Sequence, residues 1–279
     1  MTRVLVPVAV LEGETVSPGL MSLLGTVDVT VLGHHVLPEQ TPPDQARLQF
    51  EERATAALED LSEEFRAAGG AADHRLVFTH DREQTVQRVA DEVGANALAV
   101  SRPTGDVERV LVSLSGDVDA DRILSFVETL VGDRDVGVTL FLAAGAEMPD
   151  EAATDDAATD DADPTDATDP GVADEQNGAA DGSDGDEARL EAAADRLREA
   201  GIDATTERAT EGSAFDALID AAAGHDAVVM GERAPSFRSF FFGDESGRVA
   251  AASVGPVLVV RNRPEPAEGD ADATPDGEE

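Results

Sequence analysis

The sequence predicts an α/β protein made of two tandem units, each an open, parallel sheet with helices on both faces. Three observations lead to this prediction. Short aliphatic runs alternate with segments of helical periodicity along most of the chain. The order of these segments occurs twice, and the tetrapeptide RVLV opens both series, at residues 3–6 and 109–112. An internal duplication with right-handed βαβ crossovers produces two such sheets.

The first unit covers residues 1–106. Its aliphatic runs lack polar alternation, which is typical of strands buried on both faces of a parallel sheet. Its long helix carries Leu58, Leu61 and Phe65 at nearly helical spacing and stops at a Gly-Gly pair. The predicted strands are residues 3–10, 27–36, 74–78 and 95–100, and the predicted helices are residues 43–68 and 82–93.

The second unit covers residues 107–263 and repeats this order. It adds a closing strand, PVLVVR, which has no counterpart in the first unit, so the first unit is a truncated copy. The predicted strands are residues 108–114, 137–142, 203–208, 227–230 and 256–261, and the predicted helices are residues 119–131, 188–200, 213–223 and 246–253.

Two acidic segments accompany the second unit: an insertion, residues 147–187, and a tail, residues 264–279. Both are rich in Asp and Glu and contain no basic residue. Neither has enough apolar surface to offset the entropy of ordering, so both are expected to be disordered. A longer surface loop costs little, because closure entropy grows slowly with length. The insertion is expected to act as a solubilising loop or as a site for a partner.

The net charge of the chain limits the kinds of partner it can bind and indicates its environment. The formal net charge is −39, from 59 acidic and 20 basic residues, and every basic residue is an arginine. Such a chain repels phosphate backbones and anionic membranes, which argues against nucleic-acid and membrane partners. Its self-repulsion is screened over about 3 Å near 1 M salt, so the composition indicates a halophilic protein of a very salty cytoplasm.

Cysteine is absent, which excludes disulfides, thiolate metal sites and a cysteine nucleophile. The chain shows no signal segment and no apolar run of about 18 residues, so we expect a cytoplasmic location. His34 and His35 end a predicted strand, where packing is the expected role. No residues are assigned a catalytic role, because no nucleophile, general base or metal cluster follows the expected strand ends.

In an open α/β sheet, ligands bind beyond the carboxyl ends of the strands, near the reversal of strand order. The segment after residue 230 is the richest such position. Gly231 and Gly243 permit close backbone approach, and Arg233 adds positive charge to a negative chain. The alternative is that the glycines are turn residues and that the arginine pairs with nearby acids.

Several motifs together resemble the universal stress protein family. They are the Val-rich first strand, the HV pair after the second, and VVMG, FFFG and the closing PVLVVR in the second unit. The resemblance covers the chain apart from the insertion and the tail. It implies a tandem, two-domain member with a Rossmann-like, adenine-nucleotide alpha-hydrolase-like fold. It also implies a role in binding or regulation and pairing of the last strand across a dimer interface.

Members of this family that bind ATP carry a Gly-x-x-Gly-x9-Gly-Ser/Thr loop. Gly231 matches the first glycine and Gly243 the third, but the spacing between them is one residue short. Ala234 stands in place of the second glycine, and Asp244 stands in place of the hydroxyl residue, where its carboxylate opposes a phosphate. These departures predict that the second unit binds ATP weakly or not at all.

The family also has an acidic residue after the first strand, where this chain has Ala9 in the first unit and Ser115 in the second. The first unit lacks the glycine loop and is expected to bind no nucleotide. The candidate cofactor-binding residues are all in the second unit: Ser113, Ser115, Met230, Gly231, Arg233, Gly243 and Asp244. Two alternatives stay open, a degenerate member that acts through protein association and an enzyme of a related fold.

Overall fold

The computed structural model describes residues 2–143, 179–209, 213–234 and 254–262. In the first unit, every predicted strand and helix is present. A short helix after Ser17, which caps it, is an addition that was not predicted. The elements are β1 (Arg3–Val8), the 3-10 turn η1 (Val10–Glu12), α1 (Pro18–Leu23), the 3-10 turn η2 (Leu24–Thr26), β2 (Asp28–Val36), α2 (Pro43–Ala67), β3 (Ala71–Thr79), α3 (Arg82–Val93) and β4 (Ala97–Val100).

The second unit repeats this order and adds the closing strand. Its elements are β5 (Arg109–Ser113), α4 (Ala120–Val131), β6 (Gly137–Leu142), α5 (Ala179–Glu199), β7 (Ala204–Arg208), α6 (Ala214–Ala222), β8 (Ala227–Gly231) and β9 (Val257–Val260). The predicted helix 246–253, most of the acidic insertion and the acidic tail lie outside the described residues.

The start of α5 differs from the prediction. The helix begins at Ala179 and not at residue 188, so residues 179–187 are helical and do not belong to a disordered insertion. Two alanines open this stretch, and alanine has the highest helix propensity. The acids that follow them lie in the first turns, where the helix dipole stabilises negative charge. The acidic composition that indicated disorder is therefore compatible with the start of a helix.

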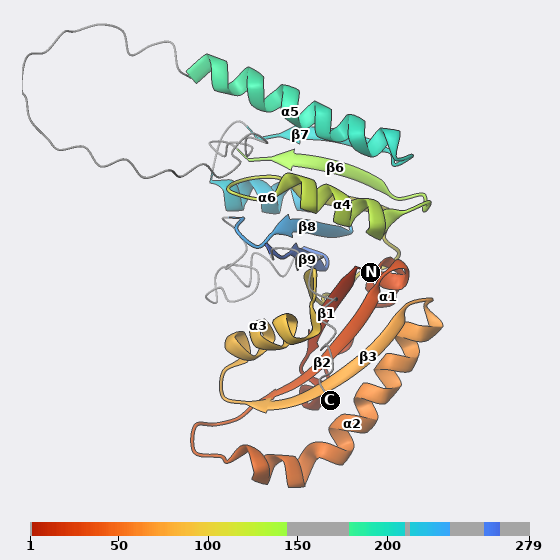
Figure 1. Ribbon diagram of the computed structural model, residues 1–279, viewed down its shortest axis with the longest axis vertical. Helices are drawn as coiled ribbons and strands as arrows, with labels where there is room; N and C mark the ends of the chain where they lie inside the picture. Colours follow the sequence, from red (N-terminus) through yellow and green to blue (C-terminus); the bar gives the residue numbers. More distant parts are fainter. Residues whose placement is uncertain (1, 144–178, 210–212, 235–253, 263–279) are drawn as a thin grey trace, which may run out of the picture.

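The described strands form one nine-stranded sheet in the order β3-β2-β1-β4-β9-β8-β5-β6-β7 (Figure 1). Within each unit the pairing is parallel, as predicted. The two units meet where β4 pairs antiparallel with β9, in a register that places Ala97 opposite Val260 and Val100 opposite Val257. The two predicted sheets are thus halves of one continuous sheet.

β9 pairs on both sides within the chain: it is parallel to β8 and antiparallel to β4. The last strand therefore has both of its edges occupied within the chain, contrary to the predicted edge pairing with a second molecule, and self-association itself stays a prediction. The physical reason is that the first unit lacks a fifth strand, which would leave the edge of β4 exposed, and β9 covers it. A covered edge cannot template pairing with another chain.

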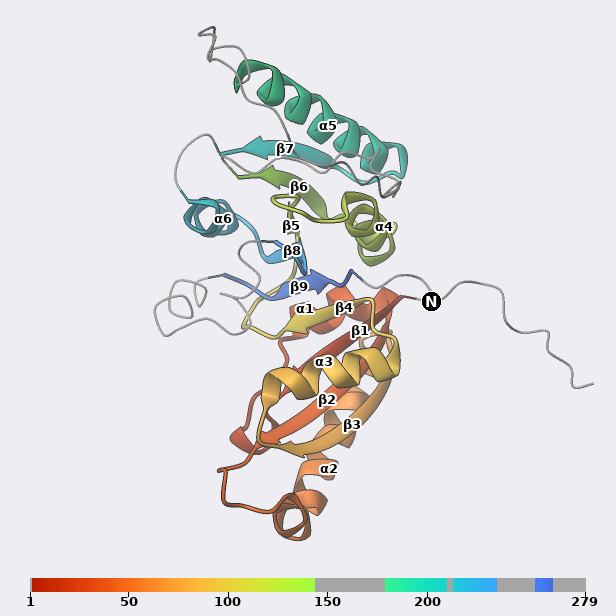
Figure 2. The same ribbon diagram turned by 60° about the vertical axis from the view of Figure 1, so that its left-hand side comes forward.

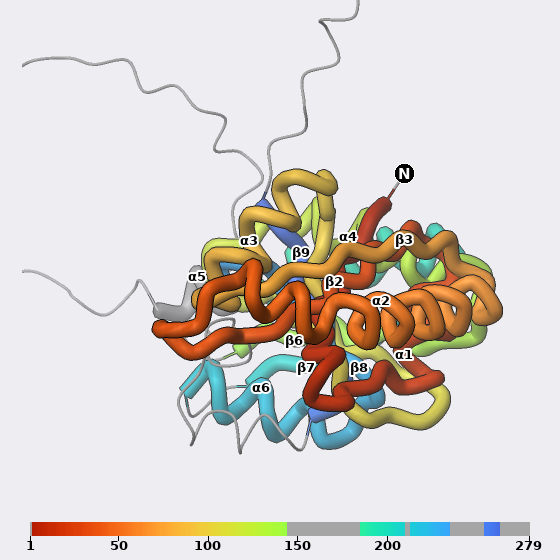
Figure 3. Tube along the Cα trace, turned by 90° about the horizontal axis from the view of Figure 1, so that it is seen from below, coloured from red at the N-terminus to blue at the C-terminus, as the bar shows by residue number. Residues whose placement is uncertain are grey.

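Helices lie on both faces of the sheet. In β3, His74 contacts Ser62 of α2 and its neighbour Arg75 pairs with Glu92 of α3, so these two helices cover opposite faces. Seen from below, α3 and α1 lie on opposite sides of the strands of the first unit (Figure 3). None of the described helices is both long enough and apolar enough to cross a bilayer.

The hydrophobic core is continuous across the two units. Leu98 of β4, Leu258 of β9 and Val229 of β8 are fully buried members of one cluster, which includes buried side chains from both halves of the sheet. The central strands are buried on both faces, as their unbroken aliphatic runs predicted. The two units therefore share a core as well as a sheet.

Arg134 joins the two units from the end of α4. Its guanidinium donates to the carbonyls of Ser22 (2.6 Å) and Leu23 (2.8 Å) at the end of α1, and to those of Leu130 and Val131 at the end of α4. Burial lowers the pKa of Arg134. Carbonyls at two helix ends, which carry partial negative charge, compensate for the lost hydration.

An equivalent arginine contact occurs at each of the two outer edges of the sheet. Arg66, at the end of α2, donates to the carbonyl of Ala72 in β3 (2.6 Å), and Arg198, at the end of α5, donates to the carbonyl of Ala204 in β7 (2.9 Å). β3 and β7 are the two edge strands. The duplication therefore extends to a side-chain contact that occupies part of each exposed edge.

Candidate functional site

The candidate residues gather where β5 and β8 end. The chain leaves β5 toward β6 on one side and enters β8 on the other, so the strand order reverses between them, which is where ligands bind in open α/β sheets (Figure 2). Ser113 lies opposite Met230 in the β5–β8 register, and both are buried. Gly243 and Asp244 lie outside the described residues.

Ser115 follows β5 and has an internal partner. Its side chain is buried, and its hydroxyl oxygen accepts a hydrogen bond from the backbone N–H of Ala143 (2.8 Å). This bond connects the loop after β5 to the end of β6. A ligand at this position would meet a hydroxyl group that already has one protein partner.

The space beside Gly231 is filled by the protein. A Cβ at this position would lie 2.7 Å from Cγ1 and 2.9 Å from Cβ of Val118, which belongs to the loop after β5. Non-bonded carbon atoms do not approach each other this closely in folded proteins. The glycine thus allows the loop after β5 to pack against the end of β8, which is a different use from the close ligand approach that we predicted there.

Arg233 points to the loop after β5 and pairs with Asp117 there, with Nη1 donating to Oδ2 at 3.0 Å. The two side chains are 62 % and 81 % exposed. An exposed pair of this kind contributes only about 0–1 kcal/mol, so Arg233 can exchange this partner for another anion at little cost. Of the candidate groups that the structure describes, Arg233 is the one positioned to meet a charged ligand.

The turn after β8 is fixed to the end of β9. Glu232 donates its backbone N–H to the carbonyl of Val260 (2.8 Å), and its carboxylate accepts the N–H of Asn262 (3.2 Å). Arg233 is therefore anchored next to a glutamate whose side chain is engaged with the backbone. Among the described residues, Asp117, Val118 and Glu232 also belong to this site. The sequence marks Asp117 and Val118 only by their place in SGDVD, residues 115–119, as an acid and an aliphatic residue that follow a Ser-Gly pair.

The equivalent position in the first unit is occupied by acidic side chains. Ala9, the first residue after β1, donates its N–H to the carboxylate of Glu14 (2.6 Å). Nearby, Glu12 contacts Nδ1 of His35 at 2.8 Å. Carboxylates at this strand end oppose the approach of a phosphate. They are consistent with the prediction that the first unit binds no nucleotide, which stays a prediction.

His34 is buried at the end of β2, with 4 % of its surface exposed. Its Nδ1 has no hydrogen-bond partner among the described residues. Burial, and secondarily the positive charge of Arg82, lower the pKa of His34 from 6.5 to about 4, against the opposing effect of Glu12. The imidazole is therefore neutral near pH 7. Within the described part of the chain, no group of His, Asp and Glu side chains could hold a metal ion.

The lowered pKa of His34 predicts acid sensitivity. The unfolded chain takes up this proton near pH 6.5 but the folded chain only near pH 4, so the free energy of unfolding falls as the pH falls between these values. The loss amounts to about 3 kcal/mol at most. In urea titrations between pH 6.5 and about pH 4, we expect the free energy of unfolding of the wild type to fall relative to that of His34→Gln. Parallel pH curves for the two proteins would contradict the prediction.

Comparison with known proteins places these features in a family. The model of the universal stress protein family matches residues 106–261. No curated protein matches the chain. Among solved structures, a universal stress protein from Archaeoglobus fulgidus DSM 4304 has 14 % sequence identity and a TM-score of 0.55, and the match covers 93 % of this chain and 96 % of that one.

Two further structures are more distant. A functionally unknown protein from Pseudomonas aeruginosa PAO1 has 15 % identity and a TM-score of 0.45, with 94 % of this chain and 92 % of that chain covered. A universal stress protein from Archaeoglobus fulgidus in complex with dAMP has 14 % identity and a TM-score of 0.25, with 50 % of this chain and 97 % of that chain covered. The likeness to the first structure shows the tandem fold. Because the family model matches more than half of the sequence, this chain belongs to the universal stress protein family.

Proposed function

We propose that the chain is a regulatory binding protein whose second unit binds an adenine nucleotide, with ATP as the ligand to test, at low affinity. The observation that carries this proposal is the convergence of two distant segments at the reversal of strand order. There, Arg233 after β8 and Asp117 after β5 face each other at 3.0 Å on an exposed rim.

Arg233 is the proposed phosphate contact. A phosphate accepts charge-assisted hydrogen bonds from a guanidinium in the same way as a carboxylate does. Because the pair with Asp117 is exposed, a phosphate group can displace Asp117 from Arg233 without leaving a buried charge unpaired. Asp117 therefore competes with the phosphate of the ligand for Arg233.

Low affinity follows from the other groups of the site. The hydroxyl of Ser115 is engaged with Ala143, and Val118 fills the space beside Gly231. Ala234 replaces the second glycine of the family loop. Each lost contact costs on the order of 1–3 kcal/mol, and two of them remove about two decades of affinity.

Two substitutions test the proposed role of Arg233. Arg233→Gln is expected to weaken ATP binding about tenfold, because it removes a charge-assisted hydrogen bond. Asp117→Asn is expected to tighten ATP binding about two- to fivefold, because it removes the competing carboxylate. Both are measured by titrating labelled ATP with Mg²⁺, at the lowest KCl concentration that preserves the fold and again at about 1 M, where screening reduces both effects.

Arg47→Gln is the matched control. Arg47 is an exposed arginine of α2 that faces Glu51 at 3.8 Å, so its replacement changes the net charge equally but far from the site. Its ATP affinity is expected to equal that of the wild type. If Arg233→Gln binds ATP as tightly as the wild type at both salt concentrations, Arg233 does not contact the nucleotide. Substitution of Gly231 is unsuitable as a binding test, because a side chain there would clash with Val118.

The alternative is a family member that binds no nucleotide and acts through protein association. The filled space beside Gly231 and the engaged hydroxyl of Ser115 are the observations that favour it. If it holds, no saturable ATP binding is found up to millimolar ligand, and both site variants behave as the wild type does.

A further inference from the structure

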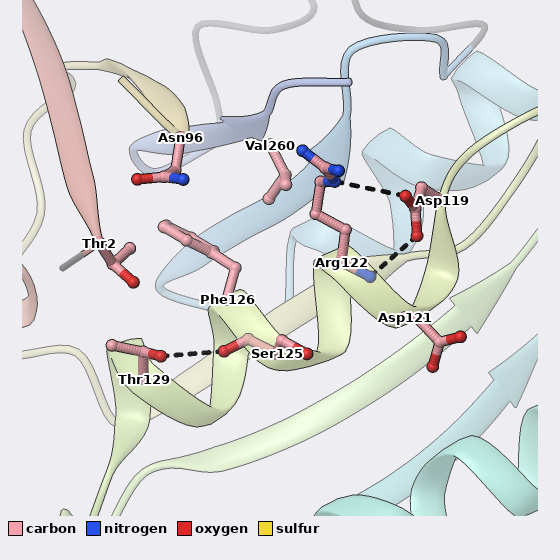
Figure 4. Close-up of a pocket in the computed structure, with 9 residues that line it drawn as sticks. All are labelled: Thr2, Asn96, Asp119, Asp121, Arg122, Ser125, Phe126, Thr129 and Val260. Carbon is pink, nitrogen blue, oxygen red and sulfur yellow. Dashed lines mark hydrogen bonds and ion pairs between the residues drawn. The ribbon is translucent and has the colours of Figure 1, made fainter. Parts of the chain in front are cut away.

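A cavity lies at the junction of the two units, and none of the candidate nucleotide-site residues that the structure describes lines it. Its volume is about 370 Å³. One wall is the face of α4 that carries Ser125, Phe126 and Thr129, and the opposite wall is formed by Thr2 and Asn96, next to the amino ends of β1 and β4 (Figure 4). Ligand pockets in proteins start at about 300 Å³, so this cavity can hold a small molecule.

Asn96 supplies hydrogen-bond donors to this cavity. Its Oδ1 accepts the backbone N–H of Arg3 at 2.8 Å, which fixes the orientation of the side-chain amide. The amide nitrogen is thereby directed to the cavity side (Figure 4). Two N–H groups are then available for an oxygen atom of a ligand.

Thr129 supplies an acceptor. Its hydroxyl donates to the carbonyl of Ser125 at 3.0 Å, one turn earlier in α4 (Figure 4). The donated proton leaves the lone pairs of the hydroxyl oxygen to accept a hydrogen bond. Donors on one wall and an acceptor on the other match a molecule whose groups both donate and accept.

The cavity also has an apolar part. The ring of Phe126 lies between Thr2 and Val260, and both Phe126 and Val260 are buried in the shared core (Figure 4). The small exposed parts of Phe126 and Val260 offer apolar contact to the carbon skeleton of a ligand.

The charges around the cavity argue against a charged ligand. Arg122 donates through Nε to Asp119 at 3.3 Å, and Asp121 accepts from Arg196 of α5 at 2.5 Å. Both carboxylates of the lining already have an arginine partner, Arg122 for Asp119 and Arg196 for Asp121, so a charged ligand would have to displace one of these partners. A neutral molecule leaves both ion pairs intact.

We propose that this cavity binds a small neutral polyhydroxylated molecule of the size of a monosaccharide. Its hydroxyl groups accept from Asn96 and donate to Thr129, and its carbon skeleton lies against Phe126. The walls come from both units, so the site exists only while β4 and β9 are paired. Such a ligand therefore stabilises the junction by mass action.

The test is an NMR titration of the full chain with D-ribose, with acetate and inorganic phosphate as charged probes. Chemical shifts are the readout, because sugars at high concentration raise melting temperatures without binding. We expect saturable shifts of the Asn96 side-chain amide and of the Ser125 and Thr129 backbone amides with ribose, and none with acetate or phosphate.

Asn96→Asp keeps the acceptor for Arg3 and removes the two donors. It is expected to weaken ribose binding at least about tenfold, since a lost donor to a polar ligand costs on that order. Asn262→Asp makes the same change outside the cavity lining and is expected to bind ribose as the wild type does. Thr129→Val removes the acceptor at nearly constant volume and is expected to weaken binding as well.

Linear, non-saturating shifts with ribose would overturn the proposal. So would saturable shifts with acetate or phosphate in the absence of ribose binding, which would make the cavity an anion site. Equal ribose affinities of the wild type and Asn96→Asp would also refute it. Arg233→Gln leaves ribose binding unchanged, so the outcome is independent of nucleotide binding by the second unit.

Discussion

Replacement of Leu258 by aspartate is expected to unfold both units together. Leu258 is fully buried in β9, opposite Ala99 of the first unit and Val229 of the second. A carboxylate at this position has no partner, and the substitution costs on the order of 5 kcal/mol or more, comparable with the whole stability of a typical domain. Because both units lose the same strand, neither retains a complete sheet.

Hydrogen exchange of backbone amides separates this outcome from a local one. The amides of β1 and β2 report the first unit, and those of β5 and β6 report the second. We expect both sets to lose protection in Leu258→Asp. Leu48→Asp is the matched control, since Leu48 is 91 % exposed and its change should cost within about 0.5 kcal/mol. Retained protection of β1 and β2 in Leu258→Asp would mean that the first unit folds without β9.

Replacement of Arg134 by leucine is expected to lower the free energy of unfolding by about 2–4 kcal/mol. The substitution leaves carbonyls at the ends of α1 and α4 without their donor. Lysine is expected to restore only part of the loss, because one ammonium group cannot donate in the fixed, forked geometry of a guanidinium. Urea unfolding of Arg134→Leu and Arg134→Lys measures both effects.

The control for Arg134 is Arg47→Leu, the same change at an exposed arginine. Arg47 has only a loose pair with Glu51 at 3.8 Å, so we expect a loss within about 0.5 kcal/mol. If Arg134→Leu is no less stable than Arg47→Leu, water replaces the guanidinium at these carbonyls. Arg134 would then contribute nothing to the junction of the units.

The sequence was sufficient to predict the order of the elements but not how the two units join. The apolar runs identify β1, β5 and β8 because these strands are buried on both faces. The partner of β9 depends on which edge is open in the folded molecule. That edge belongs to β4, which lies far away in the sequence. Two elements are longer than predicted, each for a local reason. The alternation of exposed and buried residues along the edge strand β3 hid its first residues, and the acidic residues at the start of α5 resembled a disordered segment.

The position of the candidate site was predictable and its contacts were not. The rule that ligands bind at carboxyl strand ends selected Ser113, Ser115, Met230, Gly231 and Arg233, and these residues do lie together. Their partners come from a different segment: Asp117 binds Arg233, and Val118 fills the space beside Gly231. A single sequence gives no register between the loop after β5 and the turn after β8, so it could not show these contacts.

The contact between β4 and β9 joins the two units into one sheet, and a nuclear Overhauser measurement tests it most directly. Leu98 and Val259 are direct partners in the antiparallel ladder. In labelled protein diluted with an excess of unlabelled protein, we expect cross-strand Overhauser effects between the backbone protons of these two residues within one molecule. Their absence, or their detection only between labelled and unlabelled molecules, would contradict a continuous sheet within one chain.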